Sequence, residues 1–318
     1  MDQHQRYLLT LVSLFCIGLA GGYYLNQYFH PQQQFAEVRQ NASALHFTNP
    51  LLFYTSNPDS EYDSLKNDLS KYISDAKNRG DATDISVYFR DMNSGGWTGI
   101  NYNDTYEPAS MLKVTTMIAY LNGSTENPSI LEKKLYYIQT ANQETYYTQK
   151  KITSGYYSVR TLLNWMIVNS DNAAVTALEA DDQDRTARVF SELQLSLPDG
   201  KSTDFMSARN YSRLFRVLYD STYLPPALSE QALSMLSQTT FTQGLVSGVP
   251  TGTVVSHKFG ERTLVDATGT ISHRELHDCG IIYKADHPYF LCVMTKGSDF
   301  TKLQKIISDI SALTYTKY

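Results

Sequence analysis

The strand-like segments of this chain lie at the two ends of its main part, and a long helix-like block separates them. Near the start, DISVYFRDMNSGGWTGINYN alternates apolar and polar residues around the turn-forming NSGG at 93–96, which indicates a β-hairpin. Strand patterns return only after Gly252, in TVVSHKFGE, ELHDCGIIYKA and YFLCVMTKG. An antiparallel sheet built from both ends of the chain, with an all-helical insert, fits this order. The predicted fold class is therefore α+β.

Helical patterns complete this arrangement. One helix is predicted over residues 61–79, before the hairpin, and the helical insert is predicted over about residues 110–238. A last helix is predicted over residues 301–314, because its apolar positions have the i, i+3, i+4, i+7 spacing of an amphipathic helix. These positions are Leu303, Ile306, Ile307, Ile310 and Leu313.

The N-terminus is an uncharged apolar segment over residues 7–25, long enough to span a bilayer. Residues 1–6 end in Arg6, a positive flank that favours a cytoplasmic N-terminus. The segment is either a retained transmembrane anchor or a cleaved signal peptide, because GLA at 18–20 has the small-x-small pattern of a cleavage site. The apolar run continues past this site, which favours the anchor. A buried core helix is disfavoured, since the segment is terminal and not amphipathic.

The rest of the chain is expected outside the cytoplasm, at the membrane or secreted after cleavage. Residues 26–48 are rich in Gln and Asn and lack periodicity, so we expect a linker there, followed by the main domain over residues 49–318. The formal net charge is −5 and there is no long basic run, which argues against a nucleic-acid partner. Cys279 and Cys292 fall in strand-like runs and are expected to be buried thiols rather than a bridge, although spacing alone does not decide this.

A serine and a lysine stand three residues apart in EPASMLKV, residues 107–114. Residues at i and i+3 share a helix face, and Pro108 suits a helix start, so Ser110 and Lys113 are expected side by side at a first turn. There, free backbone N–H groups and the helix dipole favour developing negative charge. A serine hydroxyl needs a base, and Lys113 can serve only if burial or a second cation lowers its pKa. Alone, the pattern also fits a helix cap followed by a solvated lysine.

Two further motifs follow in order. Ser-Asp-Asn occupies residues 170–172 after an apolar helix-like run, and Lys-Phe-Gly occupies residues 258–260 in a strand-like run. The order S-x-x-K, S-D-N, K-x-G resembles the class A β-lactamase and penicillin-binding protein superfamily of serine hydrolases. RTLLNWMIVNSDNAA, ARNYSRLFRVLYDSTYL, SHKFGE and LHDCGIIY look like an exported β-lactamase-related group within it. The resemblance covers roughly residues 49–316 and implies a β-lactamase/transpeptidase-like fold.

The resemblance also implies catalytic roles. Ser110 would be the acyl-accepting nucleophile, Lys113 would take its proton, and Ser170 would relay a proton to the leaving nitrogen. The backbone N–H groups of Ser110 and Glu261 would form an oxyanion hole, which is usually a large catalytic contribution.

Asn172, Lys258 and Gly260 are the substrate-binding residues that the resemblance implies. Asn172 would bind a substrate amide, and Lys258 would hold a substrate carboxylate and help to lower the pKa of Lys113. Asp171 would hold its loop through hydrogen bonds. Without function, the S-D-N residues would be a helix cap and Lys258 a surface lysine on a strand.

Phe259 is the first departure from the family pattern, which usually has threonine or serine there. That hydroxyl normally helps to bind a substrate carboxylate. A phenylalanine either points into the core or reshapes the pocket, so recognition of ordinary penicillins or of a terminal D-Ala is in question.

The second departure is the missing E-x-x-L-N pattern after S-D-N, which carries the water-activating glutamate of class A β-lactamases. The available acids read as helical and solvent-facing: Glu179, Asp181, Asp182 and Glu192. We therefore hypothesise that acylation is intact and that fast deacylation is not assured, as in a penicillin-binding protein.

Three functions are compatible with these features. The first is a membrane-tethered β-lactamase-like serine hydrolase, and the second is a D,D-carboxypeptidase or transpeptidase acting on cell-wall peptides with the same residues. A catalytically silent cell-surface binding protein is the third, and the retained site residues disfavour it. We expect a monomer with a β-lactam or a cell-wall peptide as its partner, and no cofactor. No metal site is expected either, because His273-Arg-Glu-Leu-His277 has its glutamate one place late for a zinc helix and reads as a strand.

Overall fold

The computed structural model describes most of the chain from residue 62 onward. The described residues are 38–39, 47, 51–53, 62–139, 152–196, 202–266 and 268–318. The apolar segment 7–25 lies outside them, as does most of the predicted linker. Within the described ranges, every helix is too short or too polar to cross a membrane.

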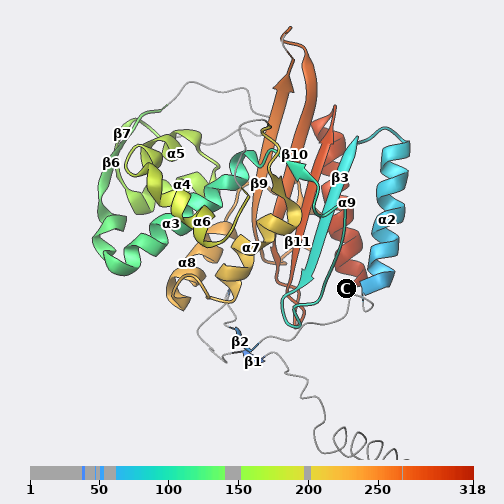
Figure 1. Ribbon diagram of the computed structural model, residues 1–318, viewed down its shortest axis with the longest axis horizontal. Helices are drawn as coiled ribbons and strands as arrows, with labels where there is room; N and C mark the ends of the chain where they lie inside the picture. The colour runs from blue at the N-terminus through green and yellow to red at the C-terminus, as the bar shows by residue number, and fades with distance from the viewer. Residues whose placement is uncertain are drawn as a thin grey trace, which may run out of the picture.

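A five-stranded antiparallel sheet forms the centre of the fold (Figure 1). Its strands lie in the order β4-β3-β11-β10-β9. Their bounds are β3 (Asp84–Asp91), β4 (Trp97–Ile100), β9 (Val255–Val265), β10 (Ile271–Ile282) and β11 (Tyr289–Gly297). β3 and β4 are the predicted hairpin. β3 pairs with β11, where Val87 faces Val293, so the sheet is built from both ends of the domain as predicted.

Two helices cover one face of the sheet, α2 (Asp63–Asn78) and α9 (Phe300–Lys317) (Figure 1). Leu69 of α2 and Ile307 of α9 are fully buried against sheet residues such as Phe89. The predicted apolar stripe of α9 is confirmed, since four of its five positions are buried and Leu313 is partly buried in the same cluster.

A block of helices covers the opposite face (Figure 1). It contains α3 (Lys113–Glu126), α4 (Val159–Val168), α5 (Asn172–Glu179), α6 (Gln183–Glu192), α7 (Ala208–Tyr219) and α8 (Pro226–Leu236). Short strand pairs accompany the helices: β5 (Thr105–Tyr106) with β8 (Met206–Ser207), and β6 (Lys134–Tyr137) with β7 (Gly155–Ser158). A third pair, β1 (Val38–Arg39) with β2 (Leu51–Phe53), precedes α2. Periodicity had indicated the helices but not these short pairs. The sheet with terminal helices on one face and a helical block on the other confirms the α+β prediction.

The two cysteines of the sheet correct the expectation of separate thiols. Cys279 of β10 and Cys292 of β11 stand directly opposite each other in the ladder and form a disulfide. The expectation was wrong because the register of this hairpin, which spacing alone does not reveal, brings the two side chains together on the same face.

Candidate active site

Ser110 lies in a tight turn between β5 and α3. A 3-10 helix over Ala109–Leu112 carries it, and α3 begins at Lys113. Ala109 has φ of 47°, a left-handed conformation that costs a residue with a side chain of order 1–3 kcal/mol and persists only where its surroundings fix it. We call residues 107–110, which enter this 3-10 helix, the nucleophile turn.

One neighbour contacts the 3-10 helix and another contacts the nucleophile turn. The hydroxyl of Tyr211 in α7 donates a hydrogen bond to the carbonyl oxygen of Met111 at 3.0 Å. Gly260 of β9 passes so close that an added Cβ would lie 2.5 Å from the Pro108 carbonyl oxygen. Gly260 therefore permits the close approach of β9, and this approach brings the following residue, Glu261, to the same cavity as Ser110.

Lys113 is the centre of the site. Its Nζ lies 2.8 Å from Ser110 Oγ, 3.1 Å from Ser170 Oγ, 2.7 Å from the Ser170 carbonyl oxygen and 2.6 Å from Asn172 Oδ1, which are four acceptors for the three N–H groups of an ammonium. Burial lowers the pKa of Lys113 to about 7, against the opposing charges of Asp171 and Glu261. A lysine with this pKa is partly neutral near pH 7 and can accept a proton from the serine hydroxyl that it contacts.

The S-D-N motif forms a loop that ends in α5. Ser170 is fully buried and has φ of 56°, a second left-handed residue at this site. Asp171 Oδ1 caps α5 by accepting the N–H groups of Ala173 and Ala174 at 2.8 and 3.1 Å. The Tyr137 hydroxyl donates to the other Asp171 oxygen at 2.9 Å. These contacts agree with the expected structural role of Asp171.

Lys258 contacts the same loop from β9. Its Nζ donates to Ser170 Oγ at 3.0 Å and to the carbonyl oxygen of Phe259 at 3.1 Å. Burial lowers the pKa of Lys258 well below its usual range, and the nearby charge of Lys113 adds to this effect. The main cause of the low pKa of Lys113 is burial rather than the charge of Lys258.

Phe259 belongs to the core. Its ring is 1% exposed and stacks on Phe241 with ring centroids 4.3 Å apart. Of the two expected alternatives, the core position is correct. The side chain is absent from the cavity lining, so position 259 supplies neither a hydroxyl nor an obstruction there.

A cavity of about 360 Å³ opens at Ser110. Its lining comes from the nucleophile turn, α3, α5 and β9, and consists of Glu107, Ala109, Ser110, Leu112, Lys113, Thr116, Asn172, Val175, Thr176, Glu179, Glu261 and Arg262. Ser170 and Lys258 are buried and do not belong to this lining. At the rim, Arg262 Nε and a Glu107 carboxylate oxygen form an ion pair at 3.2 Å.

The four acids after S-D-N occupy different environments. Glu179, at the end of α5, is helical and exposed as predicted, and it also lines the cavity, where partial burial raises its pKa. Asp181 pairs with Lys133 and Asp182 caps α6, both away from Ser110. Glu192 is exposed and accepts a hydrogen bond from Tyr223. None of these four acids hydrogen-bonds to Ser110 in the described part of the chain.

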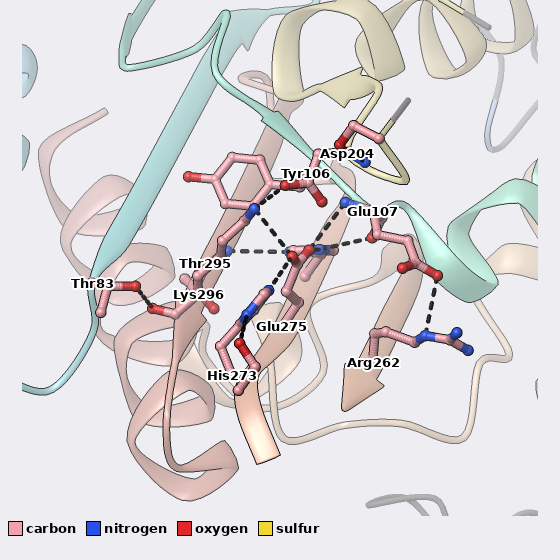
Figure 2. Close-up of polar contacts among 12 residues, drawn as sticks. Thr83, Tyr106, Glu107, Asp204, Arg262, His273, Glu275, Thr295 and Lys296 are labelled. Atoms are coloured by element: carbon pink, nitrogen blue, oxygen red, sulfur yellow. Dashed lines mark hydrogen bonds and ion pairs between the residues drawn. The ribbon is translucent and has the colours of Figure 1, made fainter. Parts of the chain in front are cut away.

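Sequence reasoning missed a buried cluster beside the nucleophile turn. Glu275 of β10 contacts His273, Lys296 and the backbone of Glu107 (Figure 2). The histidines of HRELH therefore bind a carboxylate on a strand, and no metal-binding group of His, Cys, Asp or Glu occurs in the described part of the chain. Period-2 polar residues in an otherwise apolar strand were the available signal.

The sheet, the helical block and the cluster at Ser110 together have the architecture of serine hydrolases with a β-lactamase/transpeptidase-like fold. A model of the Beta-lactamase enzyme family matches residues 64–318. The chain belongs to this family. A search of curated proteins finds no match.

Solved structures share the fold at low sequence identity. PBP-A is 18% identical with a TM-score of 0.64, over 86% of this chain and 98% of that one. The TLA-3 extended-spectrum β-lactamase is 20% identical with a TM-score of 0.68, over 80% and 98%. A class A β-lactamase from Mycobacterium abscessus is 21% identical with a TM-score of 0.66, over 79% and 98%. At these identities the likeness shows the fold and leaves activity and substrate open.

Proposed function

We propose that this protein is a serine hydrolase that forms an acyl-enzyme on Ser110 with β-lactams or related amides. The observation that carries the proposal is the 2.8 Å contact between Ser110 Oγ and Nζ of the buried Lys113, whose pKa is about 7. As Ser110 Oγ attacks the carbonyl carbon, Lys113 takes the hydroxyl proton. Ser170, in contact with Lys113 Nζ, passes a proton to the leaving nitrogen, so that the amide bond breaks and the acyl group stays on Ser110.

The remaining predicted residues have supporting positions. Asn172 and Glu261 line the cavity with Ser110, in keeping with substrate binding by Asn172 and an oxyanion site at the backbone N–H groups of Ser110 and Glu261. Lys258 acts through Ser170, whose hydroxyl it contacts. Gly260 contributes by letting β9 approach the nucleophile turn.

A D,D-carboxypeptidase or transpeptidase acting on cell-wall peptides is the second candidate. It is favoured because none of the four acids after S-D-N hydrogen-bonds to Ser110, whereas rapid hydrolysis of an acyl-enzyme needs a base for the attacking water. A mutant of the similarly folded PBP-A was captured as an acyl-enzyme complex with penicillin G.

Intact mass spectrometry of the full-length protein with benzylpenicillin tests the proposal, beside a Ser110→Ala control. A Ser110-dependent adduct that persists for hours supports the peptidase-like candidate. A transient adduct with consumption of the drug supports a β-lactamase. The absence of any Ser110-dependent adduct, with benzylpenicillin and with the activated ester p-nitrophenyl acetate, contradicts both.

A further inference from the structure

A buried charged cluster lies on β10 beside the nucleophile turn (Figure 2). His273, Glu275 and His277 alternate along the strand, so they share one face, opposite to Leu276, which packs in the cluster of α2 and α9. Glu275 and His277 are both fully buried. A buried carboxylate is costly unless it is paired and hydrogen-bonded. The partners of Glu275 therefore decide what the cluster can do.

The cluster holds both backbone polar groups of Glu107. The Glu107 N–H donates to Glu275 Oε2 at 3.1 Å, and the Glu107 carbonyl oxygen lies 3.2 Å from His277 Nε2. The Thr295 N–H donates to His277 Nδ1 at 3.1 Å, so Nδ1 is an acceptor without a hydrogen. The single N–H of the imidazole is therefore at Nε2. His277 Nε2, 3.1 Å from Glu275 Oε2, thus donates toward the Glu107 carbonyl and the carboxylate together.

The partners of both Glu275 oxygens keep the carboxylate ionised. Oε1 lies 3.2 Å from Lys296 Nζ and 3.2 Å from His273 Nε2 (Figure 2). Burial raises the pKa of Glu275, but the hydrogen bond from His277 and the charge of Lys296 outweigh it and bring the pKa to about 2. The carboxylate is therefore a permanent acceptor for the Glu107 N–H at neutral pH.

Glu107 lies three residues before Ser110, where the backbone passes from β5 into the nucleophile turn. β5 ends at Tyr106, and the first backbone hydrogen bond of the 3-10 helix runs from Met111 N–H to the Pro108 carbonyl. Glu107 lies between β5 and the 3-10 helix, and its backbone groups are hydrogen-bonded by the Glu275 and His277 side chains of β10. The left-handed Ala109 follows at once, and such a conformation persists only where neighbouring atoms fix it.

We propose that Glu275 and His277 are positioning residues for the nucleophile. They hold the Glu107 backbone, which fixes the path of the nucleophile turn and keeps Ser110 Oγ at Lys113 Nζ. This inference rests on the proposed role of Ser110. A cluster with a purely structural role would change the stability of the fold and leave the acylation rate of the folded protein unchanged.

The test compares Glu275→Met with Leu69→Ala, which shortens an equally buried side chain of α2 on the far face of the sheet. The rate of Ser110 acylation by benzylpenicillin is followed by intact mass on the full-length protein, at a temperature where circular dichroism shows each variant folded. We expect Glu275→Met to lower this rate about 100-fold, the effect of a misplacement near 1 Å. Leu69→Ala should stay within about twofold of wild type. Glu275→Gln, which keeps an oxygen for the Glu107 N–H, should recover part of the loss.

The pH profile of acylation separates positioning from charge. If Glu275 only positions Ser110, Glu275→Met should lower the plateau of the acylation rate at high pH. The midpoint of the profile, which the pKa of Lys113 sets, should stay unchanged. A wild-type rate in folded Glu275→Met, or a displaced midpoint, overturns the inference. If Glu275→Met does not fold, His277→Leu replaces it, with an expected loss of about tenfold from one missing hydrogen bond to Glu107, and a wild-type rate there overturns the inference equally. If wild type forms no Ser110 adduct with benzylpenicillin or p-nitrophenyl acetate, the proposed function fails and the positioning role fails with it.

Discussion

The titration of Lys113 should control the rate at which Ser110 is acylated. Burial lowers the pKa of this lysine from 10.5 to about 7. At pH 7 about half of it is then neutral, whereas at its ordinary pKa only about 0.03% would be, so burial raises the amount of base roughly 1,500-fold. The acylation rate should therefore rise with pH through a midpoint near 7 and level off about 1.5 pH units higher.

Quenched reactions with benzylpenicillin between pH 5 and pH 10, read by intact mass, measure this profile. Lys113→Arg is the matched variant, because a guanidinium stays charged over the whole range. It should lower the plateau rate by about 10²–10⁴-fold and abolish the midpoint. A wild-type profile that is flat from pH 5 to pH 9, or a midpoint above pH 9, would refute the reasoning that burial creates the base.

The lowered pKa of Lys113 should also make the free energy of unfolding depend on pH. Because the folded-state pKa of Lys113 lies below the unfolded value, the unfolded state binds more protons between pH 7 and 10.5. The lysine therefore destabilises the fold by about 5 kcal/mol below pH 7, and this penalty decreases as the pH rises through that window. Lys113→Met removes it, so the stability of wild type relative to the variant should increase by about 2–3 kcal/mol from pH 6 to pH 9 in urea denaturation. An unchanged difference would mean an ordinary pKa.

Three further results are expected from other parts of the structure. Glu179→Gln removes a charge that raises the pKa of Lys113, so the midpoint of the acylation profile should move to lower pH, and an unmoved midpoint would count against this coupling. Gly260→Ala forces a Cβ against the nucleophile turn, so quenched acylation reactions should slow by at least about tenfold; a wild-type rate would show that β9 can yield. Reduction of the Cys279–Cys292 disulfide should lower the free energy of unfolding by about 3 kcal/mol in urea denaturation with and without dithiothreitol. Three titratable thiols in the untreated, denatured full-length protein, instead of the one of Cys16, would contradict that pairing.

The main features of the fold and of the site were predictable because they depend on residue spacing and on the order of segments along the chain. The i, i+3 spacing placed Ser110 beside Lys113, and the order of the three motifs indicated that Ser170 and Asn172 would join them, as their contacts with Lys113 show. The alternation of helix-like and strand-like segments gave the sheet built from both ends.

The rest depends on strand register and on the direction of side chains, which local patterns leave open. Glu275 reaches the backbone of Glu107 across 168 residues of sequence. The polar alternation in HRELH was visible, but periodicity does not say that the polar face is the buried one. Cys279 meets Cys292 only because the hairpin places them opposite each other. Phe259 could have faced the cavity or the core, and the stack on Phe241 decides it.

The pairing of β3 with β11 has a consequence for how the molecule assembles over time. Val87 and Val293 face each other in this ladder, so a loop of roughly 200 residues must close before it forms, at an entropic cost of about 5 kcal/mol. Such long-range pairing makes folding slow. Ser110 and Lys113 leave the ribosome well before Lys258 and Gly260, which arrive with β9. On the proposed function, we expect Ser110 to stay unacylated in a chain that ends before β9, so that acylation of Ser110 would report that the last strands have docked.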